Sequence, residues 1–300
     1  MASIQKNTTN SVEKKMLQHN YRLIDQPTNT DIDHTKTHLN YSLTPHHDNL
    51  SHANKEDRAA MAAQEKAYYN QRLSECYHLD RADIKTWAGC IVTAPKEIAN
   101  DKDKQDQFFR AVADFLMDRY GEKNTISITV HYDEMRQKQI INTDGEQIAE
   151  FTLGEPHLHF CWIPVVAIDH EALRQKKRPV KAMFDYAEKV SAKEVLTKKE
   201  LQTLHPDLQR YLDEHLDFRC PVISGVTAAQ GGNRTVKELK KATTRDLTIL
   251  QEYIKDLEKE NKQLKEKINE LERTKEKELT WGQSTTWGDI GWNKDKEITR

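Results

Sequence analysis

Short stretches in the first 165 residues alternate apolar with polar residues or run apolar throughout, and this pattern predicts β-strands. TISITVHYDE, residues 125–134, alternates β-branched residues and gives the clearest strand. TWAGCIVTAP, residues 86–95, predicts a second strand, which Pro95 ends. ASIQK near the start and GEPHLHFCWIPV, residues 154–165, predict two more.

Three other stretches are typical of helices. Residues 55–75 are rich in Ala, Glu and Lys. Residues 102–120 place their apolar side chains on one face, and a glycine follows them. A further helix is predicted to begin after Thr197, an N-cap with a glutamate three residues later, and to run to about Leu216. Between the start and the first of these helices, irregular spacing predicts loops around a short helix.

The order of these elements predicts the fold class. QIINTDGEQIAEFTL has a turn signal at Asp144-Gly145 between two apolar arms, which favours a hairpin. Strand, helix, strand, hairpin and strand in one compact region indicate an α/β (α+β) sandwich, with a largely antiparallel central sheet flanked by helices.

A heptad repeat follows in residues 241–278 and predicts a coiled coil. The a positions are Leu247, Ile254, Asn261 and Ile268, and the d positions are Leu250, Leu257, Leu264 and Leu271. Isoleucine at a, leucine at d and one asparagine at a favour a parallel homodimer. A solitary charged helix or an intramolecular hairpin is the alternative.

The last segment, residues 279–300, repeats Thr-Trp-Gly and has no helical or strand period. We therefore expect disorder there, with tryptophans that could anchor a partner. The predicted domains are residues 1–240, the coiled coil and this tail.

Composition adds limits rather than a function. The chain has 300 residues, 31% of them charged, and a mean hydropathy of -0.87, so part of its length lies outside any core. A net charge of -2 gives no argument for a nucleic-acid partner. RQKKRPVK, residues 174–181, is locally basic, although most such runs are solvated loops. Four separated cysteines, with no long apolar span, indicate a soluble cytoplasmic protein.

Histidines in two predicted strands supply the candidate chemistry. His157 and His159 share one face of their strand, and His131 ends another. If these strands are neighbours, three imidazoles converge with a carboxylate, which suits Mn²⁺, or else Zn²⁺ or Mg²⁺. Strand parity favours Asp133 as that carboxylate, and Glu134 only if the strand bends at its end. The alternative is buried histidines with satisfied hydrogen bonds.

Four short motifs, HNYR, THLNY, HYDE and PHLH, occur in this order and resemble those of the Mob/Pre plasmid mobilisation and recombination proteins, the MobV relaxases. The resemblance covers roughly the first 240 residues, and a coiled coil follows in that family too. The spacer between HYDE and PHLH is longer here than is usual, as if a hairpin had been inserted. The family belongs to the HUH endonucleases, so the resemblance implies their sandwich fold.

The resemblance also implies roles for residues. The metal ligands would be His131, Glu134, His157 and His159, with Asp133 orienting an imidazole. His19 of HNYR would attack the phosphorus and form a phosphoramidate, and Arg22 would pair with the phosphate. Tyr21 and Tyr41 are the rival nucleophiles. Residues expected near DNA are His38, Asn40, Tyr41 and Arg81.

The sequence therefore predicts a metal-dependent relaxase that nicks one strand of plasmid DNA at a transfer origin by transesterification. Its substrate would be a single strand or a hairpin. One alternative is a rolling-circle replication initiator with a tyrosine nucleophile. The other is a non-catalytic protein for DNA binding or dimerisation.

Overall fold

The computed structural model describes residues 2–9, 11–24, 32–47, 50–141, 147–222 and 236–284. The chain divides into two compact units. The first comprises Met1–Lys138 with Glu150–Arg234, and the second comprises Gln139–Ala149 with Thr235–Arg300.

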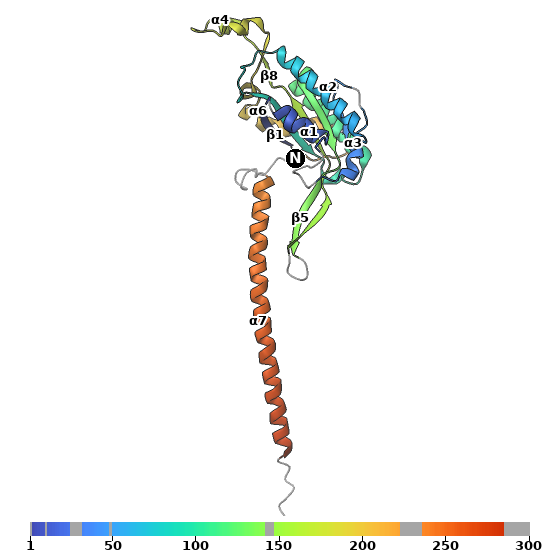
Figure 1. The fold of residues 1–300 in the computed structure, drawn as a ribbon, viewed down its shortest axis with the longest axis vertical. Coiled ribbons are helices and arrows are strands. Elements are labelled where there is room, and N and C mark those ends of the chain that lie inside the picture. Colours follow the sequence, from blue (N-terminus) through green and yellow to red (C-terminus); the bar gives the residue numbers. More distant parts are fainter. Residues whose placement is uncertain are drawn as a thin grey trace, which may run out of the picture. The chain divides into compact units, whose positions relative to one another are not determined.

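A five-stranded sheet forms the centre of the first unit (Figure 1). Its strands are β1 (Ala2–Thr8), β2 (Tyr41–Ser42), β3 (Lys85–Thr93), β4 (Thr125–His131) and β7 (His157–Trp162). The spatial order is β1-β3-β7-β4-β2, and every neighbouring pair is antiparallel. The predicted antiparallel sheet, with β4 beside β7, is confirmed.

Two helices cover one face of this sheet. They are α3 (Lys102–Tyr120) and α6 (Lys198–His215), and they share a core with Ile128 and Phe160 of the sheet. Thr197 caps α6 as predicted, since its hydroxyl accepts the Glu200 N–H at 3.2 Å. Gly121 ends α3 with a φ of 91°, a conformation that glycine adopts without strain.

The opposite face is covered by a helical segment near the N-terminus and by α2 (Lys55–Ser74). The segment consists of a π-helical stretch η1 (Val12–Leu17) and α1 (Gln18–Asn20). Met16, Met61 and Ile126 are buried between these helices and the sheet. The sheet is therefore the middle of three layers, as the sequence predicted.

Short elements complete the first unit. These are η2 (His34–Leu39), η3 (Lys96–Ile98), η4 (Glu122–Asn124), β8 (Val165–Ala167), α4 (His170–Arg174), η5 (Lys181–Asp185), β9 (Glu188–Val190) and α5 (Ala192–Val195). β8 and β9 pair as a ribbon, and the segment between them has a small core of Ile168, Leu173 and Met183. The basic run of residues 174–181 is exposed in this segment, as expected for a solvated loop.

A two-stranded hairpin of β5 (Met135–Ile141) and β6 (Gln147–Leu153) stands between β4 and β7 in the chain. The predicted hairpin arms are therefore confirmed. The predicted turn at Asp144-Gly145 lies outside the described residues.

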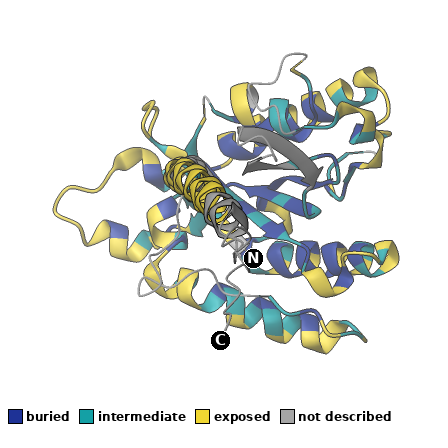
Figure 2. Ribbon diagram, turned by 90° about the horizontal axis from the view of Figure 1, so that it is seen from below, coloured by how far each residue is buried: buried dark blue, intermediate teal, exposed yellow. Residues whose placement is uncertain are grey.

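One long helix, α7 (Val236–Ser284), contains the heptad repeat. Most of the helix is exposed (Figure 2). Its d-position leucines are exposed too, with Leu264 at 48% and Leu271 at 68%. The helix continues six residues into the segment predicted to be disordered, because Lys, Glu and Leu at 275–279 are strong helix formers. Residues 285–300, with two of the three tail tryptophans, lie outside the described residues. None of the described helices is both long and apolar enough to cross a membrane.

Candidate active site

Two neighbouring strands bring three imidazoles together. In the register of β4 and β7, His131 lies opposite His157 and Thr129 lies opposite His159. The three ring centroids are 4.7 Å apart for His131 and His159, 5.0 Å for His157 and His159, and 5.4 Å for His131 and His157. Leu158 is buried on the opposite face. The parity predicted from the sequence is confirmed.

The hydrogen bonds of these rings leave nitrogen lone pairs available. His131 donates from Nε2 to the Asn20 carbonyl at 3.0 Å, so its Nδ1 carries the lone pair. His157 donates from Nδ1 to the Glu155 carbonyl at 3.2 Å, which leaves Nε2. Among the described residues, the buried atoms His131 Nδ1 and His159 Nε2 have no hydrogen-bond partner. The alternative of buried histidines with satisfied hydrogen bonds therefore does not describe this cluster.

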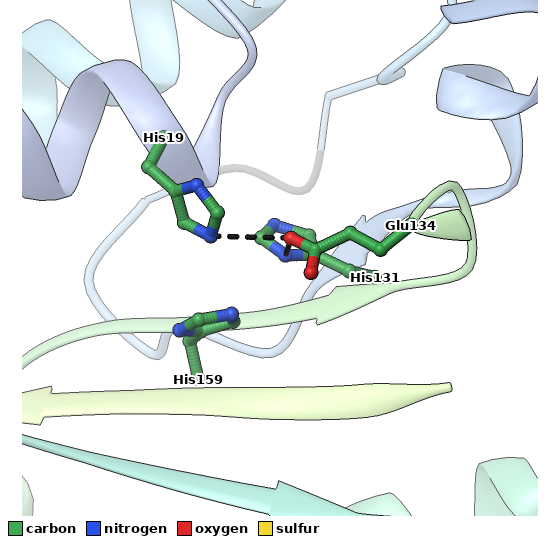
Figure 3. Close-up of side chains that lie close together, drawn as sticks. All are labelled: His19, His131, Glu134 and His159. Atoms are coloured by element: carbon green, nitrogen blue, oxygen red, sulfur yellow. Dashed lines mark ion pairs between the residues drawn. The ribbon is translucent and has the colours of Figure 1, made fainter. Parts of the chain in front are cut away.

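Glu134 is the carboxylate that joins the histidines. β4 ends at His131, so the chain leaves strand geometry before Glu134 and parity no longer applies. Its Oε1 lies 3.3 Å from His19 Nε2 and 3.7 Å from His131 Nδ1 (Figure 3). Its Oε2 lies 3.5 Å from His157 Nε2. The Gly154 N–H donates to the Glu134 carbonyl at 2.9 Å. The long spacer therefore begins and ends at this point without separating Glu134 from the histidines.

Asp133 does not contact an imidazole, contrary to the expectation from the resemblance. Its fully buried carboxylate accepts hydrogen bonds from Arg22 Nε at 3.1 Å and Nη2 at 2.8 Å, and from the Thr37 hydroxyl at 2.9 Å. Arg22 Nη2 also donates to Glu134 Oε1 at 2.9 Å. Asp133 thus acts on the cluster through Arg22, which holds Glu134 in place.

His19 approaches the cluster from the last turn of α1 (Figure 3). Its ring centroid lies 5.0 Å from that of His159 and 5.3 Å from that of His131. Its side chain is 36% exposed, whereas that of His131 is fully buried. Arg22, which has a left-handed φ of 50°, folds back and donates from Nη1 to the His19 carbonyl at 2.6 Å. Among the described residues, His19, His131, Glu134 and His159 form a group whose possible ligand atoms all lie within 4.8 Å of one another.

Burial and nearby charges set the protonation of the site. Burial lowers the pKa of His19 to about 4, and it lowers the pKa of His131 and of His159 well below the usual value. Burial opposes ionisation of Glu134, but its contacts with His157, Arg22 and His19 lower its pKa overall. Neutral imidazoles beside an ionised carboxylate are the forms that bind a divalent cation.

The other residues expected near DNA lie in different surroundings. Asn40 is buried, and its Oδ1 accepts the Tyr132 N–H at 2.7 Å, so it shapes the turn that carries Asp133. His38 is exposed on η2, with Nδ1 2.9 Å from the Thr35 carbonyl. Arg81 is exposed and pairs with Asp83 through two hydrogen bonds of 3.0 and 2.6 Å.

The two rival tyrosines are held elsewhere. The fully buried Tyr21 donates its hydroxyl to Glu65 Oε1 at 2.5 Å, and burial together with this carboxylate raises its pKa. Tyr41 packs against the core on the face opposite the histidines, and its hydroxyl donates to Asp106 Oδ1 at 2.8 Å. Neither hydroxyl belongs to the cluster.

Sequence reasoning missed two supporting residues. The Asn20 carbonyl fixes the His131 tautomer, and the Thr37 hydroxyl binds Asp133. Both stand within or beside the quoted motifs HNYR and THLNY, but only the fold shows what they contact.

Comparison with known proteins finds the family that the four sequence motifs resemble. A family model described as plasmid recombination enzyme (Mob_Pre) matches residues 1–219. A plasmid recombination enzyme of Streptococcus agalactiae is 25% identical over 240 residues, which cover 79% of this chain and 37% of that protein. The plasmid recombination enzyme type 1 of Staphylococcus aureus is 24% identical over 270 residues, which cover 89% of this chain and 54% of that protein. The chain thus spans about half or less of the length of these two relatives.

Solved structures share the fold. The MobM relaxase domain (MOBV; Mob_Pre) bound to plasmid pMV158 oriT DNA, in a Mn-bound crystal structure at pH 6.8, matches with a TM-score of 0.53 and 23% identity. The match covers 81% of this chain and 97% of that one. A Mn-bound structure of the same domain at pH 5.5 gives the same TM-score at 24% identity and covers 81% and 98%. The expected sandwich fold of these relaxases is therefore confirmed.

Proposed function

Because this chain belongs to the plasmid recombination enzyme family, we propose that it is a metal-dependent relaxase that nicks one strand of plasmid DNA at a transfer origin. The observation that carries the proposal is the convergence of His131, His157 and His159 with Glu134 on one face of the sheet. The names of the relatives and the oriT DNA bound by MobM support it.

We assign His131, Glu134, His157 and His159 as the residues that hold the ion. The donor set fits, because two buried nitrogens in it, His131 Nδ1 and His159 Nε2, face no hydrogen-bond donor among the described residues. Imidazole and carboxylate suit Mn²⁺, and Zn²⁺ and Mg²⁺ are the alternatives. When bound, the ion would polarise the scissile phosphate and stabilise charge on its oxygens.

Either His19 or His157 could complete the set of metal ligands with His131, His159 and Glu134. We assign His157 as the ligand and His19 as the nucleophile. His157 stands on a strand, and its Nδ1–H is fixed by a backbone carbonyl, as is usual for a ligand. His19 stands at a helix end with an exposed edge that DNA can reach. A bond forms between a ring nitrogen of His19 and phosphorus while the bond from phosphorus to the 3′ oxygen breaks. That oxygen takes a proton from water and leaves as a 3′-hydroxyl, and the phosphorylated ring gives its remaining N–H proton to water.

Arg22 is proposed to place Glu134 and to meet the charge of the phosphate. Its Nη2 already joins Asp133 and Glu134, so its guanidinium is fixed before DNA arrives. The rolling-circle initiator is disfavoured, since the hydroxyls of Tyr21 and Tyr41 are bound to carboxylates outside the cluster.

We also propose that α7 dimerises through its heptad leucines and Asn261, because a stripe of exposed leucines on a helix is stabilised when a second copy covers it. A cytoplasmic location is proposed for the protein, supported by its four buried free cysteines, since thiols persist in a reducing compartment.

The experiment is incubation of the protein with Mn²⁺ and a supercoiled plasmid that carries the origin, followed by electrophoresis under denaturing conditions. We expect nicked circles that disappear with EDTA, with the His159→Ala variant, or with a plasmid that lacks the origin. If the protein binds the plasmid but makes no nick with Mn²⁺, Zn²⁺ or Mg²⁺, the proposal is overturned in favour of a non-catalytic DNA-binding protein.

A further inference from the structure

A cavity of about 260 Å³ lies beside the metal-ligand cluster. His19 and His159 belong both to the cluster and to the wall of this cavity. Pockets for small molecules usually measure roughly 300–1,000 Å³, so this one has room for a single small ring system. A helix or a duplex is too large for it.

The pairing of three strands explains why the floor is hollow. Gln5 of β1 pairs with Gly89 of β3, and Gly89 pairs with Cys161 of β7. Gly89 leaves the middle of this row without a side chain. A Cβ added there would lie 3.2 Å from Cζ3 of Trp87, which is closer than usual, so a larger residue would occupy the floor and press on the Trp87 ring.

The walls combine amides with an aromatic ring. Gln5 and Asn7 contribute amides, which donate and accept hydrogen bonds as the edges of nucleobases require. Trp87 forms an apolar wall, and its indole is fixed because Nε1 donates to the Thr8 carbonyl and to Ser11 Oγ, both at 3.0 Å. Aromatic contact is the sequence-tolerant part of single-strand binding.

A cation completes the set. Lys15 lines the cavity from η1 and is exposed, so its ammonium can meet a backbone phosphate outside the pocket. Amides and an aromatic wall inside, with a cation at the surface, match a base whose phosphate remains in solvent.

Asn20 connects this cavity with the chemistry. It lines the cavity, its carbonyl accepts the Nε2–H of His131 at 3.0 Å, and its side-chain amide donates to Ser127 Oγ at 3.1 Å. It also directly follows His19. An occupant of the cavity therefore lies against the residues that place both the nucleophile and a metal ligand.

We propose that this cavity binds one base of the DNA strand, at a nucleotide directly flanking the phosphate that is cut. The inference rests on the proposed function. The bound base fixes the phosphate beside His19 and gives the enzyme a sequence preference at this one position.

The test measures kcat/KM for nicking with single-stranded oligonucleotides that each carry one abasic site, moved in single steps across the nick. For the wild type, the abasic site at one flanking position should lower kcat/KM by about 5- to 150-fold. Gly89→Val, which fills the cavity, and Gln5→Ala, which removes one amide, should lower kcat/KM for the intact strand. Ser3→Ala is the matched control. Ser3 is two residues before Gln5 on β1 and shares its face of the sheet, but it does not line the cavity.

The decisive result is the combination of a variant with an abasic site. If the base occupies this cavity, an abasic site at the sensitive position should lower kcat/KM little further in Gly89→Val and Gln5→Ala. In Ser3→Ala the same abasic site should lower kcat/KM as much as in the wild type. Additive losses at every position would overturn the inference, while nicking by the wild type would still support the proposed function. Unchanged Mn²⁺ binding shows that a variant is folded, and Gln5, on an exposed edge strand, provides the test should Gly89→Val fail to fold.

Discussion

Arg22 binds both carboxylate oxygens of Asp133, with distances of 3.1 Å from Nε and 2.8 Å from Nη2, and neither side chain is accessible to solvent. The two residues are 111 positions apart in the chain, so this pair ties the N-terminal helical segment to the end of β4. Burial opposes ionisation of Asp133, but the hydrogen bonds and charge of Arg22 lower its pKa overall. The pair fixes the guanidinium that also holds Glu134.

Replacing Asp133 with Asn should destabilise the metal-free protein by about 3 kcal/mol, because the buried guanidinium loses a charged partner. For a domain of this size the expected fall in Tm is roughly 6–12 °C. Asp83→Asn is the matched control, since Asp83 makes a similar two-bond contact with Arg81 on the exposed surface. Its Tm should hardly change, and equal losses in both variants would contradict this account of the buried pair.

Metal binding separates the roles of two histidines. His159→Ala should lose at least about 100-fold in Mn²⁺ affinity, more than the 10–100-fold typical of residues that only support a ligand. His19→Ala should keep Mn²⁺ affinity within a few-fold, because His19 is assigned to the attack on phosphorus. Isothermal titration calorimetry measures both. If His19→Ala loses as much as His159→Ala, His19 is a ligand and the assignment of His157 in its place is wrong.

The coiled coil is tested by placing a lysine either at an inward d position or at an outward f position of the heptad repeat. Leu264→Lys places a charge at a d position, and we expect sedimentation to show monomers where the wild type is a dimer. Glu266→Lys places it at the outward f position, two residues along the same exposed helix, and should remain a dimer. Monomers for the wild type, or dimers for both variants, would exclude the heptad interface.

A buried histidine outside the cluster predicts a pH dependence of stability. His52 is 2% exposed and stacks against Tyr21 at 5.5 Å. Burial and the charge of Arg58 lower its pKa from 6.5 to about 4. The unfolded chain therefore takes up this proton first as the pH falls, and stability is lost between about pH 6.5 and pH 4.

From pH 7 to pH 5 this one group should account for at most about 2 kcal/mol of lost stability. His52→Phe keeps a ring against Tyr21 and removes the titration, so its stability should fall less steeply with acid. Urea unfolding of both metal-free proteins at several pH values gives the comparison. Parallel curves would show that His52 does not contribute.

The alternation of residues along β4 and β7 was enough to predict which histidines share a face, because strand parity depends only on local sequence. The resemblance implied Glu134 as the carboxylate that joins them, but strand parity could not predict it, since β4 ends at His131 and the turn that carries Glu134 is set by distant contacts. The partner of Asp133 was missed for the same reason: Arg22 reaches it across 111 residues.

The N-terminal helical segment shows the same limit. Its irregular apolar spacing predicted little more than a short helix, yet Val12, Met16 and Tyr21 are buried against the sheet and α2. Here tertiary packing, rather than helical periodicity, determines the structure. The β8–β9 ribbon was also missed, because its strands are only three residues long.

The most direct test of the central claim is mass spectrometry of the peptide linked to DNA after a reaction with Mn²⁺ and an origin oligonucleotide. We predict nucleotide attached through phosphorus to a ring nitrogen of His19, and loss of this adduct in His19→Ala. Nucleotide on Tyr21 or Tyr41, or a nicked strand with no linked peptide, would contradict the assignment of His19 as the nucleophile.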